Sequence, residues 1–253
     1  MIIKNKSINI DFLNIKKKYK PIIIAEIGLN HLGKEHILKN YVNEAAKTGV
    51  EGISIQVLKK KFYQGKYKNL FLDNKILKNF IKQSRRKFKY VGIASDDIHL
   101  ISQFQKNGIN FVKILSKDST NLKLIQHCVE KKIKKIFIST GLDPSLSKIK
   151  KIIKKVKSKN ISLIHTNLKS NNLAINLNRI NFLKREFNLP VSYGNHSNFT
   201  DTIPNSVFYL PIAIFFYIKS NNNNVIFPDD KHAIKLKDLN KIIFNIKKNI
   251  KTL

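Results

Sequence analysis

An acid, an amide and an imidazole follow the first strongly apolar segment of the chain. Three consecutive isoleucines at residues 22–24 predict a strand that is buried on both faces. Glu26, Asn30 and His31 come at the end of this strand, which is where α/β enzymes place the polar residues of a site. The alternative is structural: Asn30 caps the next helix, His31 is solvated and the nearby glycines shape a turn.

A lysine interrupts another apolar segment. Lys113 stands within the run 110–115, and burying an unpaired lysine in a core strand costs on the order of several kcal/mol. We therefore expect Lys113 to bind an anionic ligand, with a salt-bridged core lysine as the alternative. Polar residues also stand at the ends of other apolar runs: Gln56, Ser116, Ser139, Thr140, His165, Asn195 and His196. Together they predict a site for a phosphorylated or carboxylated substrate.

The elements that must position these residues alternate along the chain. Apolar, β-branched runs predict strands at 22–27, 52–57, 89–94, 110–115, 135–139, 162–165, 190–193 and 212–218. Amphipathic stretches predict helices at 35–48, 73–87, 97–107, 119–132, 145–158, 174–187, 200–209 and 236–250. This alternation predicts an α/β protein, a single (β/α)8 TIM barrel over residues 1–253. A doubly wound open sheet is the alternative, but the glycine-rich phosphate loop it would need is not in the sequence.

Composition limits the classes of function. The formal net charge is +32, but only four of the 48 basic residues are arginines, and the lysines lie along nearly every expected helix. This favours solvated helix faces over nucleic-acid binding, although such a surface would draw phosphorylated molecules toward it. The chain has one cysteine, Cys128, and neither a signal peptide nor an apolar stretch of membrane-spanning length. We therefore expect a cytoplasmic protein without a membrane segment.

Short motifs along most of the chain resemble those of one enzyme family, the sialic acid synthases, which include the legionaminic and pseudaminic acid synthases. The opening Ala25-Glu26-Ile27-Gly28, with Asn30-His31 and Gly33, resembles the family's AEIG-x-NH-x-G. Four later segments are similar to YKIAS, LSTGM, YSDHT and GPD, in that order: residues 112–116, 138–141, 193–197 and 227–229. The resemblance covers roughly residues 15 to 250 and implies a barrel domain.

The resemblance implies an activity and a set of roles. Family members condense phosphoenolpyruvate with an N-acetylated amino sugar such as N-acetylmannosamine, release phosphate, and use manganese or magnesium as a Lewis acid. It implies a homodimer, and a small C-terminal domain that we do not expect within residues 1–253. Carried over by motif, Lys113, Ser116 and Ser139 would bind phosphoenolpyruvate, and His196 would bind the metal. Glu26 and Asp229 would contact the sugar, with Glu26 and Asp118 as the catalytic acids; Asp118 stands where the family has an acidic residue after YKIAS. Asn167 would bind substrate as the asparagine that follows the family's His-Cys-Thr.

Several positions depart from the family pattern. Ser54 stands where the family has a lysine, and Ala94 where it has a phosphate-binding threonine. The second metal histidine of the family falls on Tyr217 or Ile218, and nothing in the spacing of His165 or His232 predicts a replacement. One imidazole is a poor manganese site. Two hypotheses therefore stand, a diverged synthase and a non-catalytic relative that binds sugar or phosphate or partners a complete synthase; a nucleic-acid binder ranks behind both.

Overall fold

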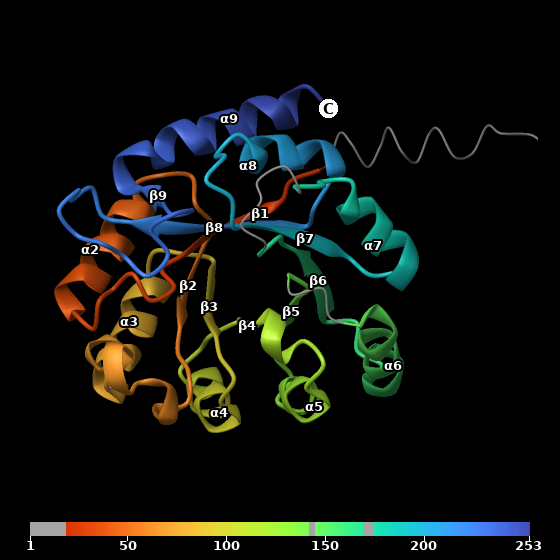
Figure 1. Ribbon diagram of the computed structural model, residues 1–253, viewed down its shortest axis with the longest axis horizontal. Coiled ribbons are helices and arrows are strands. Elements are labelled where there is room, and N and C mark those ends of the chain that lie inside the picture. Colours follow the sequence, from red (N-terminus) through yellow and green to blue (C-terminus); the bar gives the residue numbers. More distant parts are fainter. Residues whose placement is uncertain (1–18, 142–144, 169–174) are drawn as a thin grey trace, which may run out of the picture.

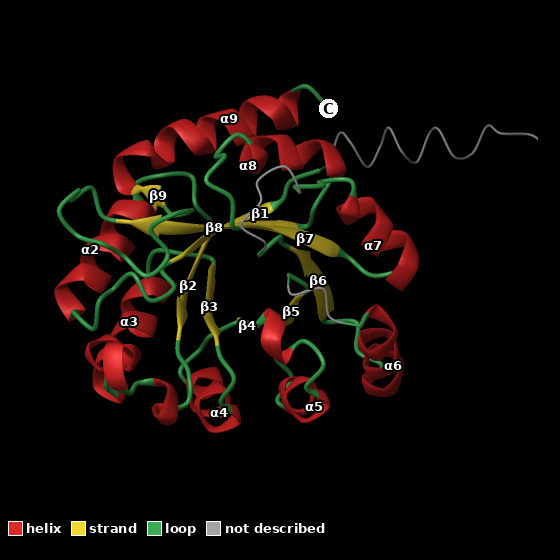
Figure 2. Ribbon diagram, viewed as in Figure 1, coloured by secondary structure: helices red, strands yellow, loops and turns green. Residues whose placement is uncertain are grey.

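The computed structural model describes residues 19–141, 145–168 and 175–253, and these form a closed barrel of eight parallel strands. Each strand pairs with the next in sequence, and β1 pairs with β8 to close the ring. Helices surround the strands (Figures 1 and 2). The strands are β1 (Ile22–Glu26), β2 (Gly52–Gln56), β3 (Tyr90–Ala94), β4 (Phe111–Ile114), β5 (Lys135–Ser139), β6 (Ile161–His165), β7 (Val191–Asn195) and β8 (Ala213–Lys219).

The predicted (β/α)8 TIM barrel is confirmed, and each predicted strand lies within two residues of the observed one. The helices are α2 (Glu35–Ala46), α3 (Asn74–Arg85), α4 (Ile98–Lys106), α5 (Leu122–Glu130), α6 (Leu146–Val156), α7 (Arg179–Phe187), α8 (Thr202–Asn205) and α9 (Leu239–Lys251). Short 3-10 turns lie at Lys60–Phe62, Gly65–Leu70, Ser116–Asp118, Ser206–Tyr209 and Leu236–Asp238. The sequence did not predict β9 (Ile234–Lys235), a two-residue strand that pairs with the end of β8 outside the ring.

Strand alternation divides the apolar residues into two layers. In β4, Val112 and Ile114 face the helices, and they belong to the large core between sheet and helices. Phe111 faces the barrel axis instead, where it packs with Phe137 and Phe215. The strands are buried on both faces, which is why their sequences read as nearly continuous apolar runs.

Three phenylalanines fill the inside of the barrel. The rings of Phe111, Phe137 and Phe215 meet edge to face, with centroids 4.9 to 6.3 Å apart. Gly92 on the neighbouring strand makes room for them, since a Cβ there would lie 2.6 Å from Cγ of Phe111. The resulting plug is an apolar floor inside the barrel.

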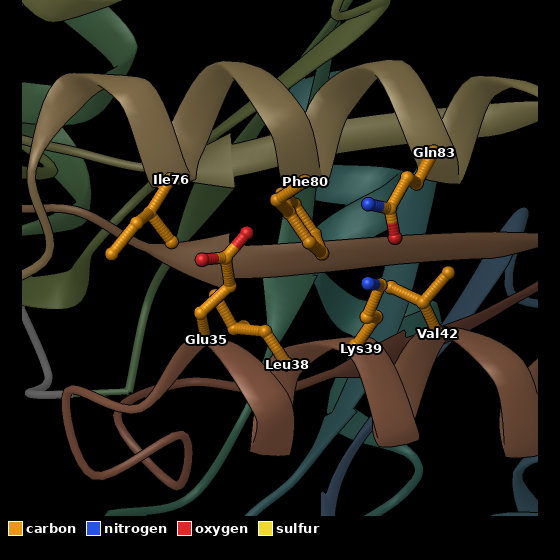
Figure 3. A pocket seen from close by; sticks show the side chains of 7 residues that line it. All are labelled: Glu35, Leu38, Lys39, Val42, Ile76, Phe80 and Gln83. Atoms are coloured by element: carbon orange, nitrogen blue, oxygen red, sulfur yellow. The ribbon is translucent and has the colours of Figure 1, made fainter.

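The helices pack on the barrel through apolar faces. Leu38 and Val42 of α2 and Phe80 of α3 meet in one such contact, with Glu35 and Gln83 at its edge (Figure 3). The groove between the two helices holds about 10 Å³, space for one water at most. It is therefore a helix–helix seam and not a ligand site. None of the helices within the described ranges has the length and apolar character needed to cross a membrane.

Candidate active site at the carboxyl ends of the strands

A buried ion pair crosses the barrel above the phenylalanine floor. Nζ of Lys113 lies 2.7 Å from Oε1 and 2.6 Å from Oε2 of Glu26, and each residue is 2% exposed. Glu26 ends β1 and Lys113 lies in β4, so the pair joins strands that are not neighbours in the sheet. Lys113 is therefore salt-bridged, the alternative weighed for it. An ammonium has three donors, and Glu26 occupies two, so one remains for a ligand.

Three aromatic side chains form one wall beside this pair. The ring of Tyr217 lies edge-on to the rings of His196 and His232, with centroids 5.2 and 4.9 Å away. The two imidazoles stack at 4.7 Å, and Nζ of Lys113 lies 5.4 Å from the centre of the Tyr217 ring. We call Glu26, Lys113, His196, Tyr217, Asp229 and His232 the mouth cluster.

A loop that returns from β8 brings Asp229 and His232 to the mouth. Lys219, the last residue of β8, donates to the carbonyl and Oδ1 of Asp230 at 2.7 and 2.9 Å. β9 then pairs with β8 and fixes the far end of the loop. Oδ1 of Asp229 lies 3.7 Å from Nε2 of His232. Because the loop is held at both ends, these two side chains are positioned by backbone pairing and not by their own contacts alone.

Asn30 fastens the β1 loop to the β8 loop. Its Nδ2 donates to the carbonyl of Ile218 at 2.8 Å, and its Oδ1 accepts from the backbone N–H of Asp229 at 3.0 Å. His31 is fully buried, and its Nδ1 accepts from the N–H of Gly33. The structural alternative for this segment is thus wrong for Asn30 and His31, since α2 is capped at Lys34 and His31 is not solvated, whereas the glycines do shape the turn, with Gly28 and Gly33 at positive φ. Both residues support the site without entering the mouth cluster.

Gly28 lets the β1 loop approach the cluster closely. Its φ is +57°, in the left-handed region that favours glycine. A Cβ at this position would lie 2.5 Å from Oδ2 of Asp229 and 2.5 Å from Cε1 of Tyr217. The loop can therefore approach Asp229 and Tyr217 this closely only because residue 28 has no side chain.

Burial sets the protonation states of the cluster. It lowers the pKa of His196 well below its usual value, with Lys113 and His232 adding to the effect. It likewise lowers the pKa of His232 to about 4, helped by Lys113 and Lys219. Burial raises the pKa of Asp229 to about 6 and, with Glu26 and Asp229, raises the pKa of Tyr217 well above its usual value. At neutral pH both imidazoles are neutral and the phenol keeps its proton.

A second polar group lies where β4 and β5 end. The hydroxyls of Ser116 and Ser139 are 2.8 Å apart, and Oγ of Ser116 also accepts from the N–H of Gly141 at 2.8 Å. Both serines are almost fully buried. Hydroxyls and a backbone amide at this end of the barrel suit the oxygens of a phosphate or carboxylate. The structure thus brings together the serines expected from the sequence.

Two more of the expected residues follow strands at the same end of the barrel. Asp118 is on the 3-10 turn after β4, where its carboxylate lies 3.8 Å from Nζ of Lys117. Burial raises the pKa of Asp118. Asn167 follows β6 and is half-buried.

The donors present do not make a complete metal site. Nδ1 of His196 is engaged by Oγ1 of Thr166 at 2.7 Å, and Nε2 of His232 has no hydrogen-bond partner in the described part of the chain. Two neutral imidazoles suit a divalent transition metal. Within the described ranges, however, no group of three or more His, Cys, Asp or Glu side chains could hold a metal ion. The metal expected from the resemblance therefore lacks a full ligand set here.

Comparison with known proteins identifies the family. The model of the NeuB family matches residues 56–253. The chain belongs to the NeuB family. This confirms the resemblance to the sialic acid synthases.

Individual relatives agree with this assignment. An uncharacterised protein of Methanocaldococcus jannaschii is 30% identical over 195 residues, which cover 72% of this chain and 57% of that protein. N,N'-diacetyllegionaminic acid synthase of Legionella pneumophila is 28% identical over 214 residues, covering 69% of this chain and 57% of that enzyme. The chain thus spans little more than half the length of these relatives. The fold matches N-acetylneuraminic acid synthetase of Leptospira borgpetersenii with a TM-score of 0.83 at 23% identity, over 92% of this chain and 85% of that one.

His232 is the cluster residue that sequence reasoning missed. It lies 36 positions after His196, and no metal-binding motif has that spacing. The only signal is its place three residues after Asp229 in the segment that resembles the family's GPD motif. Tyr217, noted only as a departure, is a central member of the wall.

Proposed function

We propose that this chain is the barrel domain of a nonulosonic acid synthase. It condenses phosphoenolpyruvate with an N-acetylated amino sugar such as N-acetylmannosamine and releases phosphate. The observation that carries the proposal is the buried Glu26–Lys113 pair, in which Glu26 takes two of the three ammonium donors, at the end of the barrel where the polar side chains of the mouth cluster gather. Membership of the NeuB family and the similarity to legionaminic acid synthases support the same reaction class.

The proposed roles follow from position. Lys113, with Ser116 and Ser139, holds the phosphate and carboxylate of phosphoenolpyruvate. When the anionic substrate takes up the ammonium, the carboxylate of Glu26 loses part of its partner and becomes free to accept a hydrogen bond from a sugar hydroxyl. Asp229 faces the sugar from the loop after β8, which lies next to the β1 loop. The new carbon–carbon bond joins the methylene carbon of phosphoenolpyruvate to the aldehyde carbon of the sugar, whose oxygen takes up a proton. Water adds to the carbon that carries the phosphate, and the bond from that carbon to the phosphate oxygen breaks to release phosphate.

The remaining proposed residues surround this centre. Asn167 and Asp118 contact substrate from the rim, and His196 presents a neutral imidazole to the sugar aldehyde or to a divalent metal. In the family a metal would supply Lewis-acid polarisation of the aldehyde. The cytoplasmic location and the homodimer expected above stay predictions.

A second candidate function is binding without turnover. The family's second metal histidine falls on Tyr217 or Ile218, and the Tyr217 ring lies beside that of His196. A relative with this substitution would hold phosphoenolpyruvate or sugar at the mouth, or partner a complete synthase, and leave them unchanged. The same residues carry both candidates, so activity separates them.

The test measures phosphate release from phosphoenolpyruvate with N-acetylmannosamine and manganese, and mass spectrometry of the sugar acid product. We expect turnover by the unmodified chain and none by Lys113→Met. Lys135→Met is the matched control, because Lys135 starts a barrel strand at the opposite end and should keep full activity. Saturable binding of phosphoenolpyruvate by calorimetry with no phosphate released would favour the second candidate. Absence of both binding and release would reject the synthase proposal and phosphoenolpyruvate binding.

A further inference from the structure

A second cavity lies at the end of the barrel opposite the mouth. It is formed by the residues just before β3, β4 and β5 together with the ends of α3 and α4, and its volume is about 440 Å³. Small-molecule sites in proteins occupy about 300–1,000 Å³. Buried Phe88, Val91, Ile109 and Ile133 provide an apolar floor. The cavity is therefore large enough for a ligand such as a nucleotide.

The walls of this cavity are cationic. Arg85, Lys89, Lys132 and Lys134 line it, and no acidic residue does. None of these four makes an ion pair with any residue in the described ranges, whereas lysines elsewhere pair, as Lys150 does with Glu186. Four unneutralised cations around one concave surface raise the local concentration of anions.

Arg85 lies against a glycine in the wall of the cavity. Gly108 has φ +98°, and a Cβ there would lie 2.7 Å from Cζ of Arg85. The guanidinium therefore lies directly against the backbone of the turn before β4. Arginine is rare in this chain, and its planar fork binds phosphate with two hydrogen bonds where a lysine makes a point contact.

The helix dipole alone does not account for this arrangement. Basic residues at the carboxyl ends of helices are favourable in any protein, and Arg86 and Lys157 occupy such positions in α3 and α6. Neither of them lines the cavity. What distinguishes Arg85 and Lys132 is that they converge on one hollow with an apolar floor.

We propose that this cavity binds a small phosphorylated anion, with a nucleotide as the ligand class that uses both the cationic walls and the apolar floor. The site is separate from the mouth and does not depend on the proposed synthase activity. An anion bound there would bridge three successive βα units of the barrel, since its contacts come from the turns before β3, β4 and β5.

Calorimetry with ATP and with pyrophosphate at 0.15 M salt, on the whole chain, tests the proposal. We expect one saturable site for ATP, weakened about tenfold or more by Arg85→Gln and by Lys132→Ala. The controls change the same charge nearby: Arg86→Gln and Lys157→Ala, the latter sharing the left-handed helix-end conformation of Lys132. Both should bind as the unmodified chain does. Tighter binding of ATP than of pyrophosphate is expected from the apolar floor.

Three results would overturn the proposal. Equal weakening by all four variants would mean diffuse attraction to a basic surface, as for RNA. Loss of ATP binding in the double variant Glu26→Gln/Lys113→Met, with Arg85→Gln unaffected, would place the anion at the mouth. No saturable binding to the folded chain would exclude the site altogether. Circular dichroism of each variant is the control for folding. We expect every variant to be folded, because Arg85 and Lys132 are exposed.

Discussion

Glu26 and Lys113 lie 87 positions apart in the chain, and the ammonium of Lys113 donates across the barrel to both carboxylate oxygens of Glu26, at 2.7 and 2.6 Å. Phenylalanines fill the barrel below them, and Nζ of Lys113 is 5.5 Å from the ring of Phe215. Removing one member of such a pair leaves the other buried without a partner. The barrel thus holds an ammonium and a carboxylate in its interior through their mutual contact.

Breaking this pair should destabilise the fold. Lys113→Met leaves Glu26 buried without its partner, and we expect a loss of about 3–5 kcal/mol in the free energy of unfolding, measured with urea. Glu26→Gln/Lys113→Met should recover most of that loss but not substrate binding. The exposed pair Lys150–Glu186 is the control, and Lys150→Met should change stability by less than about 1 kcal/mol. Equal effects of the two lysine substitutions would contradict the buried-pair account.

Gly28 should tolerate no side chain. Gly28→Ala adds a Cβ within 2.5 Å of both Asp229 and Tyr217, and overpacking of this kind costs about 1–3 kcal/mol beyond the backbone strain. Gly65 offers a matched control, with φ +53° and nothing within 4 Å of its Cβ position. Urea unfolding should show Gly28→Ala to be more destabilised than Gly65→Ala, with phosphoenolpyruvate binding lost only in Gly28→Ala. Indistinguishable variants would mean that the loop relaxes freely.

Much of the scaffold could be predicted from the chain because its strands are buried on both faces. Apolar runs such as 22–27 and 135–139 predict buried strands, and the amphipathic, lysine-rich stretches between such runs predict the helices. Polar residues such as Ser116 and His196 then fall at one end of the barrel by topology. The two-residue β9 has no such signal, since two residues are too few to show the alternation of a strand.

The partnerships within the site were beyond sequence reasoning. Lys113 could be recognised as unusual, but its partner depends on which side chain faces it across the barrel, and Glu26 shares no local pattern with it. His232 reaches His196 only because β9 and Lys219 hold the β8 loop over the mouth. Contacts set by a long loop leave no periodic trace in the sequence.

Buried histidines should make stability depend on pH. Burial lowers the pKa of His31 to about 4, so the unfolded chain binds more protons between pH 4 and 6.5. The contribution of His31 to the free energy of unfolding is therefore fully present above pH 6.5 and is lost as the pH drops toward 4. His196 and His232 act in the same direction. Asp229 acts in the opposite direction. Because burial raises its pKa to about 6, the folded chain binds more protons at this group than the unfolded chain does, and the free energy of unfolding rises as the pH falls below 6.

His31→Asn should reduce this dependence. We expect the loss of unfolding free energy between pH 7 and pH 4.5 to shrink by up to about 3 kcal/mol, because one proton-binding group of the unfolded chain is gone. His36→Asn on the exposed face of α2 is the control and should leave the loss unchanged. Urea titrations at the two pH values measure it. A loss as large in His31→Asn as in the unmodified chain would remove His31 from the explanation.

Replacing Tyr217 by histidine should create a stronger metal site. The Tyr217 ring lies 5.2 Å from the ring of His196 and 4.9 Å from that of His232, so an imidazole in its place adds a further nitrogen ligand to these two. Calorimetry should show weak manganese binding by the unmodified chain and binding about tenfold tighter or more by Tyr217→His. Tyr217→Phe, which removes only the hydroxyl, should bind as weakly as the unmodified chain. Adding His196→Ala to Tyr217→His should abolish the gain, and tight binding that survives His196→Ala would place the metal elsewhere.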